Sequence, residues 1–132
     1  MRARTLALLG LVVACSQGPT SNSGDLPLAT VTSDSGRLTA AVFSAPVVRG
    51  VNKLKLQITD GANRAQDGLA LSVTPWMASH AHGASVIPIV TPMGSGDYVV
   101  SEVDLFMPGR WQIRVSVTAP MTDTLTPALD VP

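Results

Sequence analysis

The chain has 132 residues, of which 45% are hydrophobic and only 14% are charged, and its formal net charge is zero. A chain of this length can form one domain with its own core, and this composition excludes a disordered chain and a coiled coil. Arg2 and Arg4 lie in a leader that we expect to be removed, which leaves seven basic and nine acidic residues, a net charge of −2. This balance excludes nucleic-acid binding, because a chain with a net negative charge does not attract a phosphate backbone.

Residues 1–14 have the pattern of a bacterial signal peptide. Two arginines precede an apolar run that is shorter than the roughly 20 residues a membrane-spanning helix needs. The run ends in Val12-Val13-Ala14-Cys15, which resembles the lipobox, the motif in which the cysteine of a bacterial lipoprotein is lipidated. Cys15 is the only cysteine, so it has no partner in the chain for a disulfide. We therefore expect residues 1–14 to be removed and Cys15 to carry lipid; the alternative is an ordinary signal peptide with an incidental thiol.

Residues 15–36 are predicted to be a flexible tether, because Ser, Gly and Pro are frequent in its first part. More than one acyl chain on Cys15 would anchor the protein stably to a membrane. The predicted location is therefore the cell envelope, on the side that faces the periplasm or the exterior. The expected partners are the membrane itself and an envelope protein.

Residues 37–132 are predicted to form one all-β domain. Apolar and polar side chains alternate, as in Leu54 and Leu56 against Lys53 and Lys55. Period-two alternation indicates antiparallel sheets with one buried face. About seven short strands separated by turn signals are typical of an immunoglobulin-like antiparallel β-sandwich, with a small barrel as the alternative. The predicted strands are 38–44, 51–60, 68–75, 84–90, 96–105, 110–119 and 125–131.

One short segment holds both histidines of the chain, His80 and His82. In an extended segment, residues two apart point to the same side, so both imidazoles could face one ion. Met77 adds a thioether nearby, and Met93 and Met107 lie at the ends of later apolar segments. Imidazole and thioether donors without a thiolate suit copper in an oxidising compartment. In the alternative interpretation, the histidines are solvated and the methionines fill the core.

Three segments within residues 37–118 resemble, in the same order, the motifs of the YtkA-like and FixH-like domains, which are small exported β-sandwich modules. The segments are Pro75-Trp76-Met77-Ala78-Ser79-His80-Ala81-His82-Gly83, Gly96-Asp97-Tyr98 and Met107-Pro108-Gly109-Arg110-Trp111-Gln112-Ile113-Arg114-Val115. The family often has a single histidine directly before the glycine, and His82 matches that position best. Members of this family and related modules are associated with copper handling and respiratory-oxidase assembly, so the resemblance implies copper and supplies no catalytic precedent.

No sequence pattern for catalysis accompanies these segments. The chain lacks a Gly-x-Ser-x-Gly elbow, a His-Glu-x-x-His helix and a glycine-rich phosphate loop. We therefore expect a protein that is not an enzyme, namely a lipid-anchored module that binds or transfers copper through the His/Met cluster. The alternative is a metal-free structural or protein-interaction domain, in which Met77 and Met107 form an apolar contact patch beside Trp76.

Overall fold

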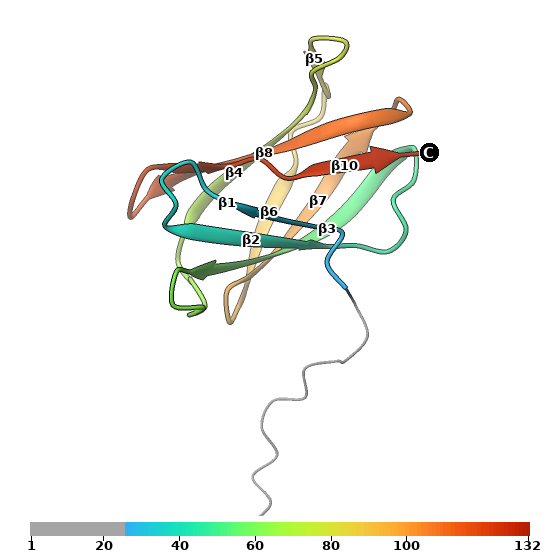
Figure 1. Ribbon diagram of the computed structural model, residues 1–132. Helices are drawn as coiled ribbons and strands as arrows, with labels where there is room; N and C mark the ends of the chain where they lie inside the picture. Colours follow the sequence, from blue (N-terminus) through green and yellow to red (C-terminus); the bar gives the residue numbers. More distant parts are fainter. Residues whose placement is uncertain (1–25) are drawn as a thin grey trace, which may run out of the picture.

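The computed structural model describes residues 26–132, which form two antiparallel β-sheets packed face to face (Figure 1). One sheet has the strand order β1-β2-β3-β7-β6, and the other has the order β10-β8-β4-β5 with β9 paired to β8. The predicted all-β antiparallel sandwich is confirmed. The strands are β1 Ala29–Thr32, β2 Leu38–Phe43, β3 Gly50–Asp60, β4 Ala70–Met77, β5 His82–Gly83, β6 Ile89–Gly94, β7 Asp97–Leu105, β8 Gly109–Ala119, β9 Asp123–Leu125 and β10 Ala128–Val131.

Three expectations about the N-terminal part fall wholly or partly outside this range. The predicted leader, residues 1–14, and the predicted lipidation site, Cys15, are outside the described residues. Within residues 26–132, no helix is long and apolar enough to cross a membrane. The predicted tether, residues 15–36, is only partly described, and its last residues include β1, which pairs with β2. The folded part therefore begins earlier than residue 37.

The alternation of apolar and polar residues decides which side of each strand is buried. On β3, the side chains of Leu54 and Leu56 are at most 1% exposed, whereas Lys55 faces solvent. The same alternation on β8 buries Trp111, whose indole Nε1 donates a hydrogen bond to the carbonyl oxygen of Met107 at 2.9 Å. Each such apolar side chain removed from water stabilises the fold by roughly 1.5–3 kcal/mol. The predicted inward and outward faces of β3 and β8 are thus confirmed.

Residues 26–132 form ten strands instead of the roughly seven predicted, because short strands cannot be recognised from periodicity. β1, β5 and β9 have only four, two and three residues, too few for an alternation to be recognised. The predicted strand 125–131 is divided between β9 and β10 at Pro127, whose carbonyl accepts a hydrogen bond from Ile113. The other five predicted strands that the structure contains are β2, β3, β4, β7 and β8, with ends shifted by a few residues.

The predicted strand 84–90 is wrong over residues 84–88, which are irregular with a bend at 85–86. The strand in this region, β6, starts at Ile89 and continues through Pro92 to Gly94. Proline cannot donate a hydrogen bond to a ladder, but β6 is an edge strand that pairs only with β7, so the missing donor is tolerated. The β6–β7 turn requires glycine at Gly96, because φ is +77° and a Cβ there would lie 2.6 Å from the carbonyl oxygen of Ile58.

A buried carboxylate, Asp123, connects the β1–β2 turn of one sheet to β9 of the other. Asp123 accepts hydrogen bonds from the backbone amide of Ser35 at 3.1 Å, from the Ser35 hydroxyl and from the backbone amide of Thr124. The amide of Asp34 also donates to the carbonyl of Thr124, at 2.9 Å. Burial raises the pKa of Asp123, but the hydrogen bonds from Ser35, Ser33 and the two amides outweigh it and lower the pKa to about 2.

Candidate metal centre

The loop with both histidines and the β6–β7 turn lie at opposite ends of the sandwich. The amide of Leu69, directly before β4, donates to the hydroxyl of Tyr98 at 3.1 Å, so β4 begins close to the β6–β7 turn. Met77 ends β4, and the loop with both histidines follows it. An eight-residue strand spans about 25 Å, so the histidines lie at the opposite end from the β6–β7 turn (Figure 1). We call this the histidine end.

The segment between β4 and β5 is a tight turn, not the extended segment that the sequence analysis assumed. The amide of His80 donates to the carbonyl of Met77 at 3.2 Å, and the amide of Ala81 donates to the carbonyl of Ala78 at 3.3 Å. Ala81 has a φ of +53°, which reverses the chain. His80 is exposed at the tip of this turn, and its ring centroid lies 5.7 Å from that of His82. The two imidazoles are therefore neighbours, although the geometry that brings them together differs from the predicted one.

Met77 and His82 form the clearest pair of candidate ligands. They are direct partners in the antiparallel register of β4 and β5, so their side chains project from the same face of the sheet. Met77 is fully buried in the core, and His82 is partly buried. The Nδ1 atom of His82 is buried and forms no hydrogen bond with any described residue. A buried polar atom without a partner is uncommon and costs about 1–3 kcal/mol, so this nitrogen requires an explanation.

Aromatic rings enclose His82 on two sides. The imidazole stacks on Phe106, with centroids 5.4 Å apart and ring planes inclined by 21°, and it meets the edge of Trp111 at 6.0 Å. Phe106 and Trp111 also contact each other, at 5.5 Å. Phe106 was not among the predicted site residues, because its only signal in the sequence is its place directly before the Met-Pro-Gly turn. These rings exclude water from one side of the imidazole and hold its orientation.

Two further methionines were candidate ligands, and the structure separates them. Met107 is partly buried, follows Phe106 in the β7–β8 turn and so lies at the histidine end. The Cε of Met77 is 3.4 Å from the position a Cβ of Gly109 would take, so Met77 reaches the same turn. Met93 lies at the end of β6 next to the β6–β7 turn and is 62% exposed. Met93 is therefore at the opposite end from the histidines and does not share their site.

The apolar contact patch of the alternative hypothesis does not form as predicted. Met77 and Trp76 are consecutive on β4 and therefore point to opposite faces of the sheet. Met77 lies in the core, whereas Trp76 is on the outer face, where the guanidinium of Arg114 lies 4.6 Å from its ring centroid. A partner could thus contact Trp76 without reaching Met77.

The donor set at the histidine end is one partly buried imidazole, one exposed imidazole and two thioethers. Among the described residues, no three His, Cys, Asp or Glu side chains group as a metal site would require. A metal held here would therefore need methionine sulfur, which favours a soft ion. The chain matches no family model, and neither the curated proteins nor the solved structures contain a significant match to it.

Proposed function

We propose that this protein is a lipid-anchored, extracytoplasmic module that binds Cu(I) at the histidine end, with His82 and Met77 as the central ligands. The observation that carries the proposal is the buried Nδ1 of His82, which has no hydrogen-bond partner and lies on the side chain directly across from Met77. A coordinate bond would satisfy this nitrogen without the cost of leaving a polar atom alone in the interior. Copper is the cargo of such a module, and no reaction is required.

The chemistry of the available donors favours Cu(I) over harder ions. A thioether and an imidazole are soft and borderline ligands, whereas calcium and magnesium prefer oxygen, which this cluster does not offer. A thioether also carries no proton to be displaced, so its affinity is less sensitive to acid than that of an imidazole. Methionine and histidine together therefore suit an oxidising compartment, in which a cysteine thiolate would be lost to oxidation.

His80 is well placed to complete the site from the solvent side. Two imidazoles that bind one ion, each with a metal–nitrogen bond of about 2 Å, have ring centroids about 5–6 Å apart. The observed 5.7 Å between His80 and His82 agrees with that span. Because His80 is exposed and His82 is partly buried, an ion could be received by His80 and retained by His82 and Met77. Met107 is a further thioether at the same end.

Two features of the sequence support the cellular setting of this proposal. The lipobox-like segment that ends in Cys15 supports anchoring to a membrane outside the cytoplasm, and the resemblance to the YtkA-like and FixH-like domains supports copper as the ion. The matched motifs of that resemblance include the Met77, His82 and Met107 positions, which lie together at the histidine end.

The test is a competition titration against a Cu(I)-specific chelator with purified wild-type protein and single variants. We expect one Cu(I) per chain, and we expect His82→Ala and Met77→Leu each to weaken binding by at least tenfold. Leucine has nearly the volume of methionine, so a loss in Met77→Leu reports the sulfur rather than the packing. Met93→Leu is the matched control, because it makes the same chemical change at the other end of the sandwich and should leave the affinity unchanged.

Circular dichroism of each variant verifies that it is folded, so that a loss of binding cannot be confused with unfolding. Equal affinities in wild type, His82→Ala and Met77→Leu would contradict the proposed ligands, and an absence of Cu(I) binding to the wild type would contradict the proposed function. The second outcome would leave the metal-free interaction domain. Phe106, which is 40% exposed, and Ile87 in the neighbouring loop would then be its apolar contact residues.

A further inference from the structure

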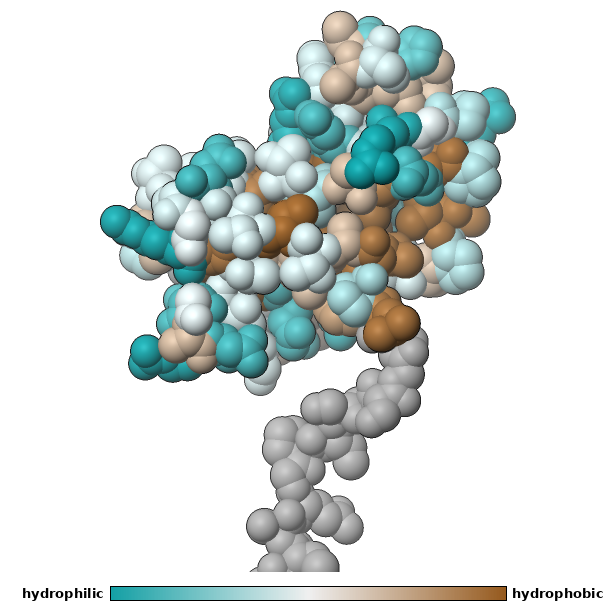
Figure 2. All heavy atoms as spheres, in the orientation of Figure 1, coloured by the Kyte–Doolittle hydropathy of each residue, from teal (hydrophilic) through white to brown (hydrophobic). Residues whose placement is uncertain are grey.

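A basic and apolar surface covers part of the outer face of the β1-β2-β3-β7-β6 sheet. Lys53 and Lys55 are two residues apart on β3, and both project from this face. Figure 2 shows apolar side chains on the side of the molecule where the described chain begins. The large apolar side chains on or beside the surface, all between 47% and 88% exposed, are Leu26, Leu28, Val48 and Val51. We call this the tether-side surface.

The residues of the tether-side surface are neighbours in space. The amide of Leu28 donates to the carbonyl of Val42 at 2.7 Å, which holds the chain before β1 against the end of β2. Phe43, the next residue on β2, is paired with Lys55, and the Lys55 ammonium lies 4.8 Å from the phenyl centroid. Leu28, Phe43 and Lys55 therefore follow one another across the sheet. The surface is continuous rather than a set of scattered side chains.

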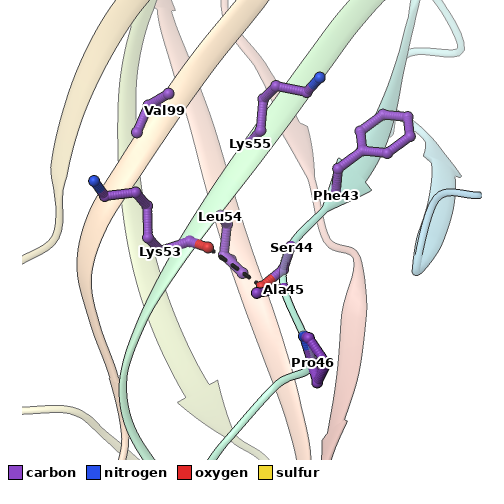
Figure 3. A pocket seen from close by; sticks show the side chains of 8 residues that line it. All are labelled: Phe43, Ser44, Ala45, Pro46, Lys53, Leu54, Lys55 and Val99. Carbon is purple, nitrogen blue, oxygen red and sulfur yellow. Dashed lines mark hydrogen bonds between the residues drawn. The ribbon is translucent and has the colours of Figure 1, made fainter. Parts of the chain in front are cut away.

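The centre of this surface is a shallow hollow of about 430 Å³ (Figure 3). Its wall includes Lys53 and Lys55 from β3, and the residues from Phe43 to Pro46 form another side. The hydroxyl of Ser44 donates to the carbonyl of Lys53 at 3.2 Å and fixes the rim. No carboxylate lines the hollow, and the Lys53 and Lys55 side chains point apart, toward two sides of it (Figure 3), so the margin of the hollow is cationic.

The charges around the hollow are not fully neutralised by neighbours. Neither Lys53 nor Lys55 forms an ion pair with any described residue. Arg49 adds a third cation at the edge of the surface, where its Nε donates to the carbonyl of Phe106 at 3.3 Å. Two acidic residues lie beside them, Asp104, which is paired with Val51, and the exposed Glu102 in the β7 bulge opposite Lys53, so three cations stand against two carboxylates. The local balance is thus positive, although the chain beyond the leader has a net negative charge.

We propose that the tether-side surface rests on an anionic phospholipid membrane. Lysines that contact phosphate groups, with apolar side chains inserted between the headgroups, are the general features of a peripheral membrane contact. Leu26 is eleven residues after Cys15 in the sequence, and eleven residues of fully extended chain reach at most about 40 Å. A lipid on Cys15 would therefore keep this surface close to the bilayer.

This contact extends the anchoring part of the proposed function and is independent of copper. A single lipidated residue holds the domain near the membrane but leaves its orientation free. The contact of the tether-side surface with lipid would fix which face of the domain turns toward the membrane. With the outer face of one sheet on the lipid, the exposed His80 at the histidine end stays accessible to an envelope protein. The lipid on Cys15 and the contact of the surface can be tested separately.

The experiment measures co-sedimentation of the unlipidated chain from residue 16 onward with phospholipid vesicles. Both sheets lie within residues 26–132, so this chain contains the whole described fold. We expect binding to vesicles of phosphatidylcholine with phosphatidylglycerol, weak binding to phosphatidylcholine alone, and a loss of binding at high salt. Each lysine near an anionic surface contributes about fivefold in affinity, so Lys53→Glu/Lys55→Glu should weaken binding by at least tenfold.

Two matched control variants test whether binding depends on this surface in particular. One controls for the change in net charge, and the other controls for the loss of an exposed apolar side chain. Arg64→Glu/Arg114→Glu changes the net charge equally, but Arg64 pairs with Asp60 and Arg114 lies on the other sheet, so binding should persist. Leu26→Ser should weaken binding, whereas Ile87→Ser, at a similarly exposed residue in the loop between β5 and β6, should not. Equal losses in the lysine and arginine variants, equal binding to both vesicle types, or no binding of the wild type would each overturn the proposal.

Discussion

The hydrogen bonds to Asp123 predict how the stability of this protein changes in acid. The pKa of Asp123 is about 2 in the folded protein and 3.8 for an ordinary aspartate. A pKa that folding lowers means that folding favours the charged form, so the stabilisation is complete above about pH 4 and is lost as the pH falls through about 2. The difference between the two pKa values corresponds to about 2 kcal/mol of unfolding free energy.

The assay is urea unfolding of wild type and Asp123→Asn at about pH 6 and about pH 2. Comparing the two proteins at each pH cancels the other titrating groups, so the difference reports the Asp123 carboxylate. We expect Asp123→Asn to be less stable than the wild type at about pH 6 and most of that difference to disappear at about pH 2. Asp34→Asn, an exposed neighbour in the same turn, should behave like the wild type. A difference for Asp123→Asn that is the same at both pH values would refute the reasoning.

Three further predictions test the core, a buried hydroxyl and the lipid anchor. Leu56→Ala and Trp111→Ala should each lower the unfolding free energy by about 2–5 kcal/mol, because each leaves a cavity, whereas Lys55→Ala on the opposite face should change it by less than about 1 kcal/mol; equal losses would mean that the strand register is wrong. Tyr98→Phe should cost about 1–3 kcal/mol in the same urea assay, because two backbone groups lose their buried partner, and an unchanged stability would contradict that role. Cys15→Ala should move the protein from the membrane fraction to the soluble fraction when the membranes are washed at high salt, which releases the electrostatic surface contact, and association that persists through this wash would argue against lipidation.

The parts of the fold that sequence analysis predicted are those in which one long strand has one buried face. On β3 and β8, eleven residues each give several repeats of the apolar alternation, which is enough to fix both the strand and its register. β6 was misplaced because an edge strand needs fewer ladder hydrogen bonds and so tolerates Pro92. In addition, the alternation of Val86, Pro88 and Val90 imitates a strand that begins before Ile89. β1 was assigned to the tether because its four residues are stabilised by pairing with β2 rather than by local pattern.

The candidate site could be predicted only in part for a similar reason. His82, Met77 and Met107 were identified because residue chemistry and the motif order are visible in the sequence. Their positions in space depend on the pairing of β4 with β5 and on the β7–β8 turn, which lies more than twenty residues away in the chain. Met93 was included because residue type alone carries no information about which end of the sandwich a side chain occupies. Phe106 was missed because aromatic stacking on a histidine leaves no periodic signal.

The interrupted edge of β6 has a consequence for molecules held close together in two dimensions. A second copy of a β-protein can extend a sheet when the edge strand offers an unbroken row of amide and carbonyl groups. Pro92 offers no amide, and the register of the ladder shifts between Pro92 and Gly94, so that row is broken in the middle of the edge. Anchored copies at high surface density could thus collide repeatedly at this edge without templating a shared sheet.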